Sequence, residues 1–116
     1  MPGRVLLRWR TGRRREYAVR YLDHLSVAVR MDGWRCVKFY RDDRFPFPEP
    51  LLWIYASGVA EDVGVVVGVR AVSGNGWVYC EALRCRSRFL FPCGDAEAAA
   101  ERVGRLLRHR MFPATW

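Results

Sequence analysis

The chain has 116 residues, a length typical of one domain, so we expect a single domain over residues 1–116. About half of the residues are hydrophobic (51%) and 14% are aromatic, which suffices for a packed core and argues against disorder. The formal net charge of +8 favours an anionic partner. No stretch reaches the ~20 apolar residues of a membrane span or has the pattern of a signal peptide, so we expect a cytoplasmic protein without a membrane partner.

The first 31 residues carry two competing patterns. Residues 4–10 alternate in the manner of a half-buried strand, and a basic turn follows at 11–15. The next segment has enough β-branched and aromatic side chains to favour two strands, over 17–21 and 25–31. As a helix, the same segment places an apolar stripe on one face, at Ala18, Tyr21, Leu22, Leu25 and Val29. The strands are favoured, and the helix at about 16–30 stays as the alternative.

The middle of the chain predicts two strands separated by a proline-rich loop. Asp32-Gly33 is typical of a two-residue hairpin turn, and the alternation after it predicts a strand over residues 34–41. Residues 42–50 contain three prolines and therefore predict a loop with little regular pairing. Residues 51–55 are apolar and predict a short strand.

The second half predicts a hairpin and then a helix. Residues 63–73 are almost all apolar, as in a buried central strand, and the glycines within them indicate a bulge or a close backbone approach. Asn75-Gly76 supplies a turn into a return strand over residues 77–86. A helix is predicted from Asp95, as the N-cap, to Met111, with basic side chains in its last turn.

Together these elements predict an α+β fold. Its main form is a β-rich, curved antiparallel sheet or small, partly open barrel of about six to seven strands, closed by one C-terminal helix. If residues 16–30 are helical instead, the fold becomes a two-layer α+β structure with both helices on one face of the sheet.

Arginine clusters are the main functional signal. Nineteen of the 20 basic residues are Arg, a skew that genome base composition also produces, so the surplus charge matters more than the residue type. Residues 84, 86 and 88 would share one face of a continuous strand. Four further arginines lie on the predicted C-terminal helix: Arg102, Arg105, Arg108 and Arg110. We expect a non-catalytic nucleic-acid-binding protein that contacts phosphates through Arg8, Arg10, Arg13, Arg14, Arg15, Arg84, Arg86 and Arg88.

A protein-interaction or structural subunit of a larger assembly, viral or ribonucleoprotein, is the alternative function. Phe45 and Phe47 lie in the proline-rich loop, and Phe112 and Trp116 lie in the C-terminal tail. On a monomer these side chains would be exposed, and a protein partner or a second copy would bury them. The two functions are compatible, because an assembly subunit can carry a basic face.

Catalytic and metal-binding patterns are weak. The chain has four cysteines: Cys36, Cys80, Cys85 and Cys93. Their spacing matches no zinc or thioredoxin motif, so we interpret them as buried free thiols, with disulfides or a zinc site as the alternatives. His24 follows Asp23, but the sequence places no nucleophile beside this pair, and the acids of the 42–50 loop are typical of solvated turns. We therefore expect no enzyme, no metal site and no cofactor.

Overall fold

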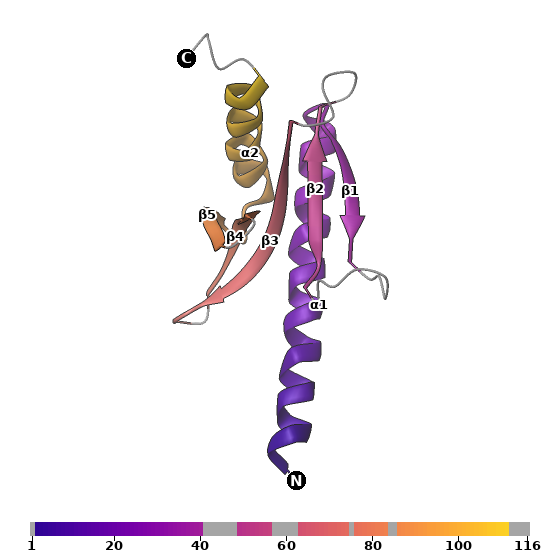
Figure 1. The fold of residues 1–116 in the computed structure, drawn as a ribbon, viewed down its shortest axis with the longest axis vertical. Helices are drawn as coiled ribbons and strands as arrows, with labels where there is room; N and C mark the ends of the chain where they lie inside the picture. The colour runs from indigo at the N-terminus through magenta and orange to yellow at the C-terminus, as the bar shows by residue number, and fades with distance from the viewer. Residues whose placement is uncertain (1, 41–48, 57–62, 75, 84–85, 112–116) are drawn as a thin grey trace.

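A computed structural model describes residues 2–40, 49–56, 63–74, 76–83 and 86–111, with their side chains except at 2–14, 83 and 86–87. The elements, in chain order, are α1 (Pro2–Met31), β1 (Arg35–Phe39), β2 (Leu51–Tyr55), β3 (Gly64–Val72), β4 (Gly76–Leu83), β5 (Arg86–Pro92) and α2 (Ala96–Met111). The strands form one open antiparallel sheet in the order β1-β2-β3-β4-β5 (Figure 1). The predicted α+β class is confirmed, whereas the predicted barrel and its six to seven strands are wrong, because the described strands number five.

Helix α1 replaces the three strands predicted for the first 31 residues. The alternative helix at 16–30 is correct, and it extends back to Pro2. Leu22, Leu25 and Val29 are fully buried, at the spacing of one helical face, so packing outweighs the β propensity of the segment. Leu and Arg dominate residues 4–15, and both are good helix formers, which favours helix over the alternating strand predicted there.

The Asp32-Gly33 pair ends α1 and does not form the predicted hairpin turn. Gly33 has φ of 92°, and its amide donates to the carbonyl of Arg30 at 3.0 Å. The Trp34 amide donates to the carbonyl of Val29 at 3.0 Å. These two bonds form a Schellman motif, in which glycine adopts the left-handed conformation after the last helical turn. A helix end and a tight hairpin both require positive φ, so the same dipeptide serves either.

The strand and helix predictions for the rest of the chain hold with one exception. Residues 34–41, 51–55 and 63–73 contain β1, β2 and β3. The predicted β3–β4 hairpin is present, but Gly76 is part of β4 and pairs with Val72, so the turn lies before Gly76 and not at the predicted Asn75-Gly76 pair. The exception is the return strand predicted over residues 77–86. It ends at Leu83, and β5 begins at Arg86 as a separate strand antiparallel to β4. The sequence between them, Arg84-Cys85, lies outside the described residues and contains none of the usual turn residues.

Both helices pack on the same face of the sheet. Leu25 of α1, Leu52 of β2 and Leu107 of α2 are fully buried in one hydrophobic core. The Tyr79 hydroxyl donates to the carbonyl of Tyr21 at 2.6 Å, which joins β4 to α1. The N-terminal part of α1 extends well beyond the ends of the strands (Figure 1). The arrangement is therefore the predicted two-layer alternative, with helices forming one layer and the sheet forming the other.

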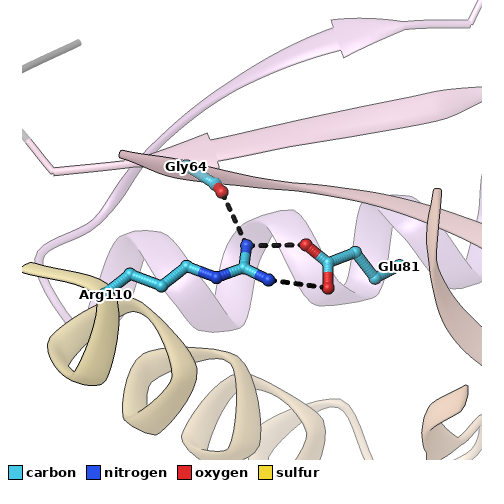
Figure 2. A network of polar contacts seen from close by, with 3 residues as sticks. All are labelled: Gly64, Glu81 and Arg110. Carbon is cyan, nitrogen blue, oxygen red and sulfur yellow. Dashed lines mark hydrogen bonds and ion pairs between the residues drawn. The ribbon is translucent and has the colours of Figure 1, made fainter. Parts of the chain in front are cut away.

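Arg110 attaches the C-terminal end of α2 to the sheet (Figure 2). Its guanidinium contacts the two carboxylate oxygens of Glu81 in β4 at 2.6 and 2.8 Å, and it donates to the carbonyl of Gly64 in β3 at 3.0 Å. The Glu81 side chain is only 4% exposed, so Arg110 supplies the counter-charge that its burial requires. At the other end of α2, the Asp95 side chain accepts from the Ala98 amide at 3.0 Å, as predicted for the N-cap.

Candidate nucleic-acid interface

A groove lies between α2 and the edge strand β5. The apolar face of α2, which includes Ala99, Val103 and Leu107, is buried in the core. Two adjoining hollows of about 390 and 210 Å³ remain along the edge of the sheet. Both are lined by the same four residues, Phe89, Leu90, Arg102 and Arg105. We therefore treat the two hollows as one surface and name it the α2–β5 groove.

The α2–β5 groove is positively charged. Arg88 from β5 and Arg102 and Arg105 from α2 line it, and Glu101 is the one acid among its described lining residues. Arg105 pairs with Glu101 at 2.9 Å, but both side chains are about two-thirds exposed, so the pair is weak. Arg88 and Arg102 are exposed and form no ion pair with any described residue. Their guanidinium groups are the strongest candidates for binding an anion.

A β-bulge in the β4–β5 pairing sets which side chains face the groove. Tyr79 pairs with Phe91 and Cys80 pairs with Phe89, so Leu90 is the extra residue on β5. Leu90 is buried in the core, whereas Phe89 is 59% exposed at the rim of the groove. An exposed aromatic ring beside exposed arginines is a combination that single-strand nucleic-acid-binding proteins use.

The described arginines among those predicted to contact phosphates lie on two different parts of the fold. Arg88 lines the groove and Arg86 lies two residues earlier on β5, but Arg84 is outside the described residues. β4 ends at Leu83 and β5 begins at Arg86, so the continuous strand on which that prediction depended is not present, and the place of Arg84 beside the other two stays a prediction. The N-terminal candidates lie on α1 and not on a hairpin: Arg8, Arg10, Arg13, Arg14 and Arg15.

Arg102 and Arg105 are groove residues that sequence reasoning placed on the helix without choosing them for the site. The available signal was their position on α2 away from the apolar stripe, but the strand beside them was not predicted. The four aromatic candidates for protein interaction, Phe45, Phe47, Phe112 and Trp116, lie outside the described residues. Their role stays a prediction.

The described cysteines and acids form no metal site. No group of three His, Cys, Asp or Glu side chains that could hold a metal ion occurs in the described part of the chain. Burial raises the pKa of the Cys93 thiol to about 12 and also raises that of Cys80. Both thiols are therefore protonated at neutral pH and are poor nucleophiles.

Comparisons with known proteins give no functional information, so a functional proposal depends on the geometry of the chain itself. No protein-family model, curated protein or solved structure matches the chain. Among the described residues, neither helix is both long and apolar enough to cross a membrane.

Proposed function

We propose that the protein binds nucleic acid, without catalysing a reaction, through phosphate contacts in the α2–β5 groove. The observation that carries this proposal is that the lining of one groove holds two exposed guanidinium groups, of Arg88 and Arg102, which form no ion pair with any residue in the described part of the chain. Guanidinium groups bind phosphate oxygens in a bidentate manner and stay charged at every physiological pH. The net charge of +8 adds a long-range attraction that speeds encounter with a polyanion.

The basic N-terminal part of α1 supplies a second attractive segment in this proposal. Six arginines lie between residues 4 and 15, on the part of the helix that extends beyond the sheet (Figure 1). This segment lies away from α2 and β5 (Figure 1). We therefore propose that it attracts nucleic acid non-specifically and does not contribute to the specific phosphate contacts in the groove. A protein-interaction role remains the alternative, and its aromatic candidates lie outside the described residues.

Fluorescence anisotropy with labelled single-stranded DNA, single-stranded RNA and duplex DNA tests the proposal. We expect the logarithm of the association constant to fall linearly with the logarithm of salt concentration. If Arg88, Arg102 and Arg105 each contact one phosphate of a single strand, the log–log slope should be about −2. Additional contacts by α1 would make this slope steeper. Absence of binding to all three probes at about 50 mM salt, where electrostatic attraction is strong, would refute the proposal.

A further inference from the structure

The sheet face opposite the helices, which we call the open face, carries two aromatic side chains from β2. Strand β2 alternates, with Leu52 and Ile54 fully buried under the helices and Trp53 and Tyr55 partly exposed on the other side. Residues paired across an antiparallel sheet share a face. Trp53 pairs with Val37 and Val66, so the open face continues from β1 to β3. Both described helices lie on the opposite side, where their buried residues share the core with Leu52 and Ile54.

Trp53 and Tyr55 form a stacked aromatic pair on this open face. Their ring centroids are 4.5 Å apart and their planes meet at 28°. The indole lies over Gly64 of the neighbouring strand, where a Cβ would overlap its Nε1 atom. Leu51 approaches Gly68 in the same way, with its Cδ2 atom 3.2 Å from where a Cβ would stand. A close approach is therefore present at Gly64, where it lets the Trp53 indole lie across β3, whereas at Gly68 the neighbour is the end of one side chain.

Positive charge lies on the same face as the aromatic pair. Arg35 pairs with Tyr55 across the β1–β2 ladder, and Arg70 alternates with Gly64 along β3, so both share the open face. Both arginines are exposed. Glu81, the one acid within the described strand residues, lies on the helix side and is bound by Arg110. The face therefore combines aromatic rings with cations and has no carboxylate among its described strand positions.

Phe89 belongs by register to the open face and also lines the α2–β5 groove; Gly68 and Cys80, which lie between Phe89 and Trp53 on this face, are buried. Phe89 pairs with Cys80, and Cys80 pairs with Gly68, which places Phe89 on the same face as Trp53. Phe89 also lines both hollows of the groove. A nucleic-acid single strand whose phosphates lie in the groove can therefore pass over Phe89 and bring its bases onto the open face of the sheet.

We propose that Trp53 and Tyr55 form a platform on which the bases of single-stranded nucleic acid stack. This inference rests on the proposed nucleic-acid-binding function and makes it specific for single strands. Bases in a duplex are already stacked on one another, whereas those of a single strand are free to stack on protein rings. A second copy of the chain fits the face less well, because like charges at Arg35 and Arg70 oppose its approach.

The test compares three variants by anisotropy with a 20-nucleotide single strand and its duplex. Trp53→Leu/Tyr55→Leu should weaken single-strand binding by about tenfold or more and leave duplex binding and the salt slope unchanged. Trp53→Phe/Tyr55→Phe keeps two rings and should retain most of the affinity. Tyr17→Leu is the matched control, since it removes a partly exposed ring from α1, away from the platform.

A second measurement uses the unaltered protein, so it tests the platform even if the double leucine variant fails to fold. Ultraviolet crosslinking to a bromouracil-containing strand should yield adducts within residues 51–55. Adducts elsewhere alone would overturn the platform. Equal affinity for single strands and duplex, unchanged in the leucine variant, would also overturn it but leave the groove proposal intact. Absence of any binding would remove both proposals. A dimer that becomes monomeric in the leucine variant would assign the face to a second copy instead.

Discussion

Replacement of Arg110 by alanine is expected to lower the free energy of unfolding by about 3 kcal/mol, because it leaves a buried carboxylate without its partner. Glu81 is 3% exposed, and its two oxygens are held by this one guanidinium. The variant also removes the donor to the Gly64 carbonyl. Urea denaturation followed by circular dichroism measures the change.

Two further variants separate the buried pair from exposed charge effects. Arg105→Ala breaks an exposed pair one turn earlier on the same helix and should cost no more than about 0.5 kcal/mol. Glu81→Met/Arg110→Met removes both charges together, so it should be less destabilising than Arg110→Ala. If Arg110→Ala and Arg105→Ala lose the same stability, the Arg110–Glu81 contact does not hold α2 on the sheet.

The double variant Arg88→Glu/Arg102→Glu is expected to weaken nucleic-acid binding by about 100-fold at ~0.1 M salt. If the groove binds phosphates as proposed, each reversal would remove one phosphate contact and add a repulsive charge to the groove. The salt dependence should also become shallower, by about 1.4 in the log–log slope for a single strand. Anisotropy titrations at several salt concentrations measure both quantities.

The matched control for this loss is Arg20→Glu/Arg30→Glu. It changes the net charge of the protein equally, but both residues are exposed on α1, which does not line the groove. We expect a loss below about tenfold, which reflects long-range attraction alone. Equal losses in the two double variants would mean that overall charge, and not the groove, determines affinity.

The elements that the sequence predicted correctly are those whose local signals agree with their final environment. Leu51–Tyr55 is apolar on both faces and does form a strand within the sheet. The α2 prediction combined an N-cap, an apolar stripe and a basic last turn, and all three features are present. The β3–β4 hairpin has a turn signal between two strand-forming segments, so local preference and tertiary pairing point the same way.

The errors occur where local and tertiary preferences differ. Residues 17–31 are rich in Val and Tyr, which favour strands, yet the helical stripe ending at Val29 is buried in the core against the sheet. Asp32-Gly33 then supported the wrong fold, since the same positive φ ends a helix. Strand β5 was missed because Arg84-Cys85 carries no turn signal, and without it Arg88 had no predicted neighbour on α2.

The candidate site was only partly predictable for the same reason. Arg88 was selected from its alternation with neighbouring arginines, but its partners Arg102 and Arg105 are joined to it only by the packing of α2 on β5. The Trp53–Tyr55 pair depends on which face of β2 the helices leave open. Neither arrangement can be inferred from spacing along the chain.

Amide hydrogen exchange of the unaltered protein, with and without a single-stranded 20-mer at low salt, tests the central claim most directly. The groove predicts that added strand slows exchange in β5, from residue 88 to residue 91, and in the α2 segment from residue 101 to residue 109. Protection of those two segments together would locate the nucleic acid between them. Protection confined to residues 2–14 of α1, with β5 and α2 unchanged, would contradict the groove and assign binding to the basic helix alone.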